Sequence, residues 1–381
     1  MGEAIKIGIT GQSGFIGTHL FNYLGLKTNI VRIPFLDEYF NNKFKLQEFV
    51  KSCDAIVHFA ALNRHYDPCV IYKTNIDLVK KLISACEQTN SRPHVLFSSS
   101  TQEENDNPYG KSKYDGRKLF EDWAFNNNAQ FTGLVLPNVF GPFGNPYYNS
   151  FIATFCHQLT HNEQSEIQVD SKVPLIYVSE LVKEFLNQII KFNNTDENLP
   201  RINKVHVSST SQYKVSEVLT LLERYKENYF SKGTIPELTN TFELNLFNTF
   251  VCYINHKQFF PYSLIKQSDA RGTFIEIIKI NSGGQVSFST TKPGITRGNH
   301  FHTRKAERFA VIKGNAKIAI RRVGTPDIFT FVLNGNNPSF VDMPIWYTHN
   351  ITNVGDDELF TIFWINESFN PDDSDTYFEE V

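Results

Sequence analysis

The stretch that most restricts the fold lies near the N-terminus, where a short apolar run leads into spaced glycines. Residues 5–10, IKIGIT, are typical of a buried strand. Gly11, Gly14 and Gly17 follow with GxxGxxG spacing, and the helical pattern THLFNYL comes directly after them. A strand–turn–helix of this kind presents free backbone N–H groups that attract a pyrophosphate. A glycine-rich turn without a ligand is the alternative, but this context favours a dinucleotide.

The segments around this turn predict further contacts with a dinucleotide. Residues 54–61, DAIVHFAA, read as a second buried strand that ends in small residues, which let a cofactor lie close. Asn63 and Arg64 follow, should face the cleft and are expected to contact the substrate. The expected cofactor contacts are Gly11, Gly14, Phe15, Ile16, Gly17, Arg32, Phe59, Ala60, Ala61, Tyr109 and Lys113.

The residue at the end of the strand that lies between these two segments in the sequence indicates which cofactor is bound. Folds that prefer NAD usually place an acid there to hold the ribose 2′-OH. In the strand expected over residues 29–33, NIVRI, the position is near Arg32, and no acid follows until Asp37. A cation suits a 2′-phosphate, so Arg32 favours NADPH, although a surface arginine is an equally good interpretation.

A serine-rich strand end and a YxxxK pair carry the predicted redox chemistry. The strand HVLFSSS ends at Ser100, and Tyr109 and Lys113 follow four residues apart on a predicted helix, where they share a face. An ammonium one turn from a phenol is expected to lower its pKa, and a serine hydroxyl can hydrogen-bond a substrate carbonyl. Such a trio transfers a proton while a nicotinamide transfers hydride.

Together these motifs resemble the extended short-chain dehydrogenase/reductase family. PNVFGP (137–142) and LIYVSELV (175–182) also match. The resemblance implies that Tyr109 is the acid, Lys113 its activator and Ser100 the carbonyl-binding hydroxyl. Asn138 and Asn149 are expected to contact the substrate, although Asn149 also suits a helix N-cap. Val135-Leu136 replaces an arginine common before PN, and Ser179-Glu180 replaces an aspartate common after YV.

A second chemical signal lies in the C-terminal third. His300, His302 and Glu307 form HxHxxxxE, and His349 lies in the later block PIWYTHNITN. Strand alternation puts His300 and His302 on one face. Three imidazoles and one carboxylate match the ligand set of a divalent metal, with zinc the expected ion.

These two blocks resemble the paired motifs of cupins, which are small β-barrels. The run after Ser268 also resembles the dTDP-sugar 3,5-epimerase branch, in which the histidine after RG is a base. His300 therefore has two competing roles, ligand or base. The branch's enolate-stabilising lysine corresponds to Arg308, and Arg271 is expected to contact substrate. The matching residues are Asp269, Arg271, Gly272, Phe274, Glu276, Gln285, Ser289, Gly294, Arg297, Gly298 and His300.

Length and composition are consistent with two globular domains. The chain has 381 residues, 41% hydrophobic, which predicts more than one core. We place the boundary at 255/256, with an α/β Rossmann-type domain over 1–255 and an all-β cupin, a jelly-roll barrel, over 256–381. Net charge is −3, and no basic block or apolar run stands out, so neither nucleic acid nor membrane is expected as a partner. Five cysteines without a CxxC motif, and no signal peptide, predict a cytoplasmic protein.

Over its full length the chain resembles the CapF-type (WbjC-type) enzymes of bacterial capsule and O-antigen synthesis. The resemblance includes DNPYG, SSS, RGxF, KPGIT, GNHxH and the ending DTYF-EV. It implies that the cupin inverts C3 of a UDP-2-acetamido-2,6-dideoxy-4-hexulose and that the reductase domain then reduces C4 with NADPH, giving the L-talose sugar. It also implies a zinc-type site at His300, His302, Glu307 and His349. We expect a homodimer.

Two rival functions remain open from the sequence. A 4,6-dehydratase or 4-epimerase would use the same N-terminal fold, but dehydratases need an acid pair that Thr101-Gln102-Glu103 breaks. A non-catalytic metal- or sugar-binding cupin joined to a degenerate cofactor domain is the second rival. The intact Tyr109 and Lys113 argue against it.

Overall fold

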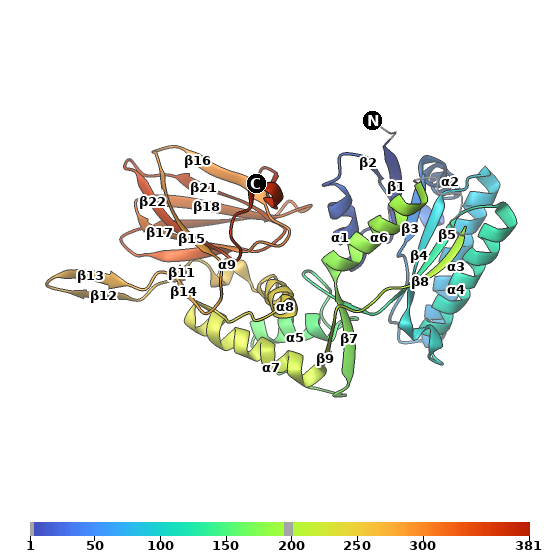
Figure 1. Ribbon diagram of the computed structural model, residues 1–381, viewed down its shortest axis with the longest axis horizontal. Coiled ribbons are helices and arrows are strands. Elements are labelled where there is room, and N and C mark those ends of the chain that lie inside the picture. Colours follow the sequence, from blue (N-terminus) through green and yellow to red (C-terminus); the bar gives the residue numbers. More distant parts are fainter. Residues whose placement is uncertain (1–3, 194–200) are drawn as a thin grey trace. The chain divides into compact units, whose positions relative to one another are not determined.

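The computed structural model describes residues 4–193 and 201–381, and the chain divides into two compact units (Figure 1). The first contains the residues up to Phe151 together with Ser171–Lys214. The second contains Ile152–Asp170 and Val215–Val381.

The first unit is built on a six-stranded parallel sheet in the order β2-β1-β3-β4-β5-β8. Strands alternate with helices along the chain, which is the Rossmann-type arrangement expected from the sequence. A smaller sheet, β6-β7-β9, follows β5. The strands are β1 (Ile5–Thr10), β2 (Ile30–Ile33), β3 (Ala55–His58), β4 (His94–Ser100), β5 (Phe131–Leu136), β6 (Asn138–Phe140), β7 (Lys172–Tyr177), β8 (Ile202–His206) and β9 (Ser211–Lys214).

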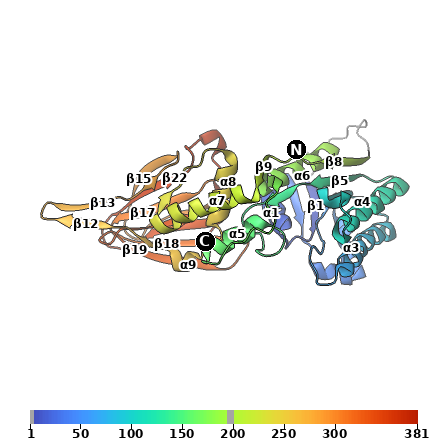
Figure 2. The same cartoon turned by 90° about the horizontal axis from the view of Figure 1, so that it is seen from below.

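Helices cover both faces of the six-stranded sheet (Figure 2). One core joins α2, α3 and α4 to the sheet, and a second joins α1 and α6 to its other face. A parallel sheet buried on both faces explains why runs such as IKIGIT and AIVH are continuously apolar. The helices are α1 (Phe15–Leu24), η1 (Asp37–Asn41), α2 (Lys43–Ser52), α3 (Pro68–Thr89), η2 (Thr101–Glu104), α4 (Pro108–Asn127) and α6 (Val178–Asn193).

The second unit is a barrel-like sandwich of two five-stranded antiparallel sheets, in the orders β11-β20-β17-β22-β15 and β19-β18-β21-β16-β23. This is the all-β, cupin-type architecture expected from the sequence. The strands are β11 (Tyr262–Ser263), β15 (Gln285–Thr291), β16 (Thr296–Phe301), β17 (Glu307–Lys313), β18 (Asn315–Arg322), β19 (Ile328–Asn334), β20 (Ser339–Met343), β21 (Tyr347–Asn353), β22 (Leu359–Ile365) and β23 (Tyr377–Phe378).

Further short elements surround the barrel. Strands β12 (Lys266–Asp269) and β13 (Gly272–Ile275) form a hairpin that extends away from it (Figure 1). The remaining elements are α5 (Phe151–Thr160), α7 (Val215–Tyr225), the π-helical η3 (Lys226–Ser231), β10 (Thr234–Ile235), α8 (Thr241–Val251), α9 (His256–Phe259), β14 (Lys279–Ile280) and η4 (Pro371–Asp373).

The packing of residues 215–255 differs from the division expected from the sequence. These residues group with the barrel rather than with the parallel sheet. The Tyr229 hydroxyl donates to Asp342 at 2.6 Å, and the Arg308 guanidinium donates to the Gly233 carbonyl. The buried side chains of Arg308 on β17 and Asp342 on β20 need hydrogen-bond partners. Residues 215–255, which precede the expected boundary, supply two of them. The 255/256 boundary stays a prediction of where the sequence that resembles a dehydrogenase/reductase ends and the sequence that resembles a cupin begins.

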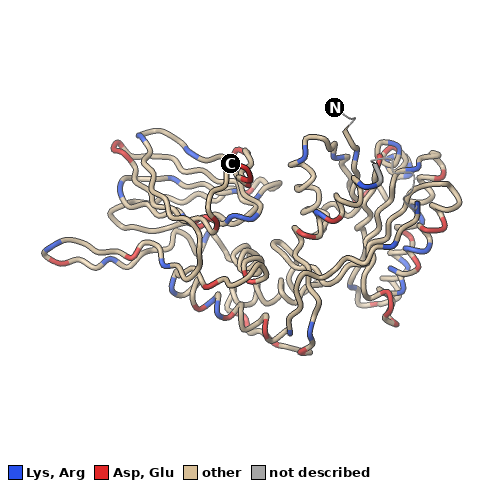
Figure 3. Tube along the Cα trace, in the orientation of Figure 1, with Lys and Arg blue, Asp and Glu red and all other residues tan. Residues whose placement is uncertain are grey.

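Charges are mixed along both units. In the described residues, Lys and Arg are interspersed with Asp and Glu (Figure 3). None of the helices within the described ranges has the length and apolar character required to span a bilayer.

Candidate functional site

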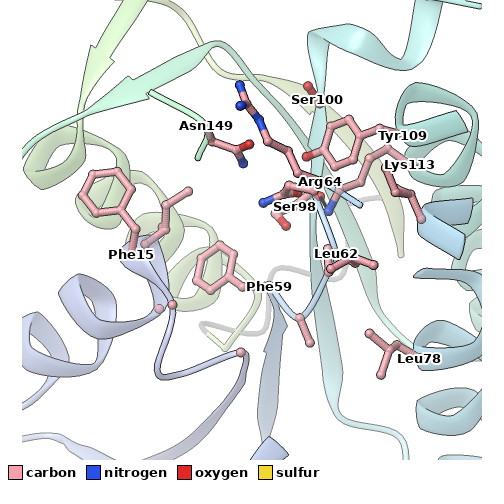
Figure 4. Close-up of a pocket in the computed structure, with 18 of the residues that line it drawn as sticks. Phe15, Phe59, Leu62, Arg64, Leu78, Ser98, Ser100, Tyr109, Lys113 and Asn149 are labelled. Carbon is pink, nitrogen blue, oxygen red and sulfur yellow. Dashed lines mark hydrogen bonds between the residues drawn. The ribbon is translucent and has the colours of Figure 1, made fainter. Parts of the chain in front are cut away.

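The first unit contains a cavity of about 1180 Å³ at the carboxyl ends of its parallel strands (Figure 4). The residues after β1, β3 and β4 line it, which is where ligands bind in open α/β sheets. Each cofactor contact expected from the sequence lines this cavity, except Arg32.

The glycine turn comes close to neighbouring backbone. Gly11 has φ +69°, and a Cβ there would lie 2.7 Å from the backbone nitrogen of Ala60. A Cβ on Gly17 would lie 2.2 Å from the Gly11 carbonyl oxygen. A side chain at Gly11 would collide with the backbone that follows β3, and one at Gly17 would push α1 away from the turn. The first N–H groups of α1, at Phe15 and Ile16, therefore remain close to the cavity, where they can bind a pyrophosphate.

Arg32 lies elsewhere. Its guanidinium carbon sits 4.3 Å from the centre of the Phe21 ring, and Nη1 donates to the Phe21 carbonyl at 3.1 Å. The side chain thus packs against the C-terminal half of α1. Asp37 lines the cavity instead, 3.4 Å from the Ser13 hydroxyl. A cation that does line the cavity is Lys81 of α3, which pairs with Asp77 at 2.9 Å.

Tyr109 and Lys113 project from α4 into the cavity (Figure 4). The helix begins after Asn107, whose side chain accepts from the Gly110 N–H. The Lys113 ammonium lies 5.7 Å from the Tyr109 ring centre and donates to the Ser98 carbonyl at 2.9 Å. This geometry brings together the pair expected from YxxxK.

Burial decides the protonation of this pair. It lowers the pKa of Lys113 to about 8 and raises the pKa of Tyr109 to about 12. The sequence predicted a lowered tyrosine pKa, but here desolvation dominates and the nearby Tyr148 adds to it. A protonated phenol at neutral pH suits a proton donor.

The three serines at the end of β4 have different environments. Ser98 donates to the His58 carbonyl, and Ser99 donates to Glu103. Ser100 is half-buried, lines the cavity beside Tyr109 (Figure 4), and accepts from the Gln102 N–H. Ser100 is therefore the serine whose hydroxyl is best placed for a ligand carbonyl.

The carboxylate of Glu103 is hydrogen-bonded within the protein and is not available for acid–base reaction with a ligand. Its carboxylate accepts two hydrogen bonds of 2.8 Å from Arg117, in addition to that from Ser99. Burial would raise the pKa of Glu103, but the Arg117 guanidinium outweighs it and the pKa is lowered. A carboxylate bound in this way is a poor general acid.

The predicted substrate contacts of the first unit also line the cavity. They are Asn63, Arg64, Asn138 and Asn149. The Arg64 guanidinium donates to the Tyr147 carbonyl at 3.1 Å. Tyr148, which our sequence reasoning missed, accepts from the Asn63 N–H at 3.3 Å. Its position directly before Asn149 was the available signal.

In the second unit, His300, His302, Glu307 and His349 converge between the two sheets. Their candidate ligand atoms all lie within 4.8 Å of one another. Glu307 Oε2 is 3.0 Å from His349 Nε2 and 3.4 Å from His302 Nε2. His300 pairs with His349 across β16 and β21, while Glu307 begins β17 in the other sheet.

A backbone irregularity in β16 orients the side chain of His300. The register shifts between Gly298 and His300, and Gly298 has φ +105°. A Cβ on Gly298 would lie 2.7 Å from the His349 carbonyl oxygen. Glycine therefore permits close approach of β16 to β21, and the bulge redirects the next side chains.

The ionisable groups of the cluster interact strongly with one another. Burial, with the imidazoles of His349 and His302, lowers the pKa of His300 to about 4. Burial opposes charge on His302 and Glu307, but each favours the charged form of the other. The pKa of His302 is therefore raised and that of Glu307 is well below its usual range.

The donor atoms fit a divalent cation. His302 Nε2, Glu307 Oε2 and His349 Nε2 are buried and make no hydrogen bond. Buried polar atoms without hydrogen bonds are costly, and three of them converge here on one point. Imidazole nitrogens with one carboxylate are ligands that zinc accepts.

Arg308 is not brought to this cluster. It neighbours Glu307 on β17, so its side chain points to the opposite face. The guanidinium is fully buried and donates twice to Asp342 at 2.8 Å. The enolate-stabilising role expected for Arg308 therefore lacks the necessary geometry.

Arg271 occupies the exposed β12–β13 hairpin. It is paired with Asp269 at 2.6 Å, and its side chain is 90% exposed. Its contacts in the described residues lie within the hairpin itself. Contact between Arg271 and a substrate stays a prediction.

Comparison with known proteins agrees with these features. Residues 7–199 match the NAD dependent epimerase/dehydratase family, and residues 267–377 match the polysaccharide biosynthesis C-terminal domain. The chain is 32% identical over 374 residues to a UDP-2-acetamido-2,6-beta-L-arabino-hexul-4-ose reductase of Pseudomonas aeruginosa, covering 98% of each chain.

Solved structures give the same result. The capsular polysaccharide assembling protein CapF from Staphylococcus aureus is similar over 99% of this chain and 100% of its own, with a TM-score of 0.60 and 33% identity. RMD from Pseudomonas aeruginosa complexed with NADPH covers 59% of this chain and 83% of its own, with a TM-score of 0.51 and 20% identity. The likeness to RMD concerns the fold alone.

The fold and the cavity define a short-chain dehydrogenase/reductase-type domain joined to a cupin-type barrel, in the class of sugar-nucleotide reductases and epimerases. The full-length matches are more specific. The chain belongs to the CapF family of capsular polysaccharide enzymes.

Proposed function

We propose that the chain is a bifunctional capsule-sugar enzyme. The cupin unit epimerises C3 of a UDP-2-acetamido-2,6-dideoxy-4-hexulose, and the other unit reduces the C4 ketone with NADPH to UDP-2-acetamido-2,6-dideoxy-L-talose. The observation that carries the proposal is the Tyr109, Lys113 and Ser100 group in the cavity. It occurs in a chain that matches a keto-sugar reductase from end to end.

In the reduction, the chain's residues bind and protonate the ketone oxygen. The Ser100 hydroxyl donates to it, and Tyr109 gives it a proton. Lys113 lies on the next turn of α4 and is anchored by Ser98, which supports its role as the positive charge behind Tyr109. The nicotinamide supplies the hydride.

In the epimerisation, a base removes the proton from C3. His300 is the most exposed of the four cluster residues, which supports contact with substrate. Its place within the cluster equally supports a ligand role. His300, His302, Glu307 and His349 would hold a divalent metal, expected to be zinc, whose positive charge would favour an enolate.

The order of the two reactions follows from acidity. Only the C4 ketone makes the C3 proton labile, and reduction removes that ketone. Epimerisation must therefore come first and needs no hydride donor.

NMR of the products formed in D₂O from a UDP-4-keto sugar tests the proposal. Without NADPH, deuterium should enter C3, and with NADPH the C4 alcohol should form. Reduction without deuterium at C3 would remove the epimerase half of the proposal. Absence of NADPH oxidation would remove the reductase half.

A His300→Ala variant distinguishes the two roles of His300. Loss of zinc assigns it as a ligand, whereas loss of C3 exchange with zinc retained assigns it as the base. Thermal melts exclude unfolding as the cause of either result.

The dehydratase alternative is weakened by the position of Glu103. Its carboxylate is occupied by Arg117 and Ser99, so it is not free for acid–base exchange with a sugar. A tightly bound, non-exchanging NAD in the purified protein would favour that alternative.

A further inference from the structure

The C-terminal tail passes beside the histidine cluster. Strand β23 pairs with β16, with Phe378 opposite His300. The buried ammonium of Lys305 donates to the Ser374 carbonyl at 2.8 Å. The tail thus contacts both sides of the turn that follows His302. The ending DTYF-EV, one of the motifs that resemble CapF-type enzymes, therefore lies beside the histidine cluster.

Asp375 makes the central contact of this tail through its backbone. Its carbonyl oxygen lies 2.6 Å from His302 Nδ1. A carbonyl only accepts hydrogen bonds, so Nδ1 carries the proton. The other nitrogen, Nε2, is thereby the atom that faces Glu307, at 3.4 Å.

The Asp375 side chain fixes where that carbonyl lies. The carboxylate accepts from the Thr303 N–H, from the Thr303 hydroxyl at 2.6 Å and from the Arg304 N–H at 3.0 Å. The residue is only 4% exposed and has φ +45°, a conformation that most side chains avoid. A buried carboxylate with three donors outweighs this local strain and ties the tail to the turn after His302.

We propose that Asp375 is a positioning residue for the metal site: its carboxylate anchors the tail so that its carbonyl holds His302 with Nδ1 protonated and Nε2 directed at the metal. The proposal rests on the zinc site proposed above. Groups that orient a ligand histidine in this way typically change metal affinity by about 10–100-fold.

Zinc titration of the full-length protein against a chromogenic chelator tests the inference. Asp375→Ala should bind zinc about tenfold or more weakly, because the three donors lose their acceptor. Asp375→Gly removes the same carboxylate but tolerates φ +45°, so it separates the lost hydrogen bonds from backbone strain. Asp375→Asn keeps one acceptor oxygen and should retain more affinity than either.

Asp372→Asn is the matched control, since it removes an exposed acid three residues away. It should bind zinc as the wild type does. Cobalt substitution supplies a spectroscopic signature: the d–d bands should change in Asp375→Gly and stay unchanged in Asp372→Asn. Melts of the metal-free variants show whether the barrel still folds.

The outcomes separate the two proposals. Unchanged zinc affinity in a folded Asp375→Gly protein overturns the positioning role. A wild type that binds no zinc overturns the metal site itself. The His302 Nδ1–H resonance of the metal-free protein then decides the inference. Its loss in Asp375→Gly supports the positioning role, and its persistence overturns it.

Discussion

Tyr109 and Lys113 lie on adjacent turns of one helix, and burial affects them in opposite directions. The phenol is kept protonated, with its pKa at about 12, while the pKa of the ammonium falls to about 8. A reductase requires the first effect, because its tyrosine must donate a proton at neutral pH. The second means that burial makes the charge on Lys113 less favourable than it is in water, although the lysine stays mostly protonated at pH 7.

Tyr109→Phe should reduce the rate of NADPH oxidation by about 10²–10⁴, the usual contribution of a positioned acid. Deuterium exchange at C3 should be unaffected, because it requires the ketone alone. Stopped-flow absorbance and NMR measure the two activities on one preparation. Normal reductase turnover in this variant would take Tyr109 out of the mechanism.

Lys113→Met should stabilise the first unit at pH 7 while abolishing reduction. The folded pKa of about 8 lies below the unfolded value of 10.5, so the buried charge is unfavourable at every pH below 8. Stability should then rise between those two values, where only the unfolded chain keeps the proton. We expect a gain of about 1–3 kcal/mol at pH 7.

Thermal melts at pH 7 and pH 10 measure this effect. The advantage of Lys113→Met over the wild type should shrink at pH 10. An equal advantage at both pH values, or a loss of stability at pH 7, contradicts the assignment.

The proposed cofactor, NADPH, carries a 2′-phosphate, which is expected to need a cation within the cavity. Lys81→Ala should weaken NADPH binding more than NADH binding, whereas Arg32→Ala, whose side chain packs on α1, should leave the preference unchanged. Fluorescence titration of the wild type and of both variants with NADPH and with NADH gives the dissociation constants for this comparison. Tighter binding of NADH by the wild type would contradict NADPH and would identify Asp37 as the residue that holds the 2′-OH.

At the scale of an element, β17 shows how one strand serves two purposes. Glu307 faces the histidine cluster, and Arg308 faces the segment that covers the barrel. The alternation of side chains along a strand makes this separation unavoidable. A change to the Arg308 pair should therefore affect folding before it affects chemistry.

Asp342→Asn should destabilise the second unit by about 3–5 kcal/mol, since it leaves the buried guanidinium without its counter-charge. Glu227→Gln is the matched control: the pair that Glu227 forms with Lys232 is exposed to solvent, so this substitution should leave the free energy of unfolding nearly unchanged. Denaturant unfolding gives both values. Below the transition, Asp342→Asn should still exchange deuterium at C3; its loss in folded protein would return Arg308 to a catalytic role.

At the scale of the whole molecule, residues 215–255 belong by packing with the barrel. Tyr229 and Gly233 complete the hydrogen bonds of Asp342 and Arg308. A barrel without them would leave the buried pair of Arg308 and Asp342 without these two hydrogen-bond partners. The homodimer stays a prediction that sedimentation analysis can test.

A segment of residues 215–381 should therefore be more stable than one of residues 256–381. The longer segment should show a higher melting temperature and bind one zinc ion per chain. The shorter should melt lower, and zinc should raise the melting temperature of both, because binding adds directly to the stability of the folded form. Equal melting temperatures would show that residues 215–255 contribute nothing to the barrel.

Local spacing was enough to predict most of the polar groups that the fold brings together in the cavity and in the histidine cluster. The glycine turn, the serine strand end, YxxxK and HxHxxxxE each lie within a few residues, where strand or helix period fixes the direction of the side chains. Even the separation of Arg308 from Glu307 followed from that period, although our sequence reasoning assigned both to the site.

Contacts between residues that are far apart in the sequence decided the features that local spacing did not predict. Arg32 packs on Phe21, burial rather than Lys113 governs the Tyr109 pKa, and Asp375 reaches His302 across 73 residues of chain. Desolvation and hydrogen bonding depend on which segments meet in space, and no spacing rule along the chain contains that information.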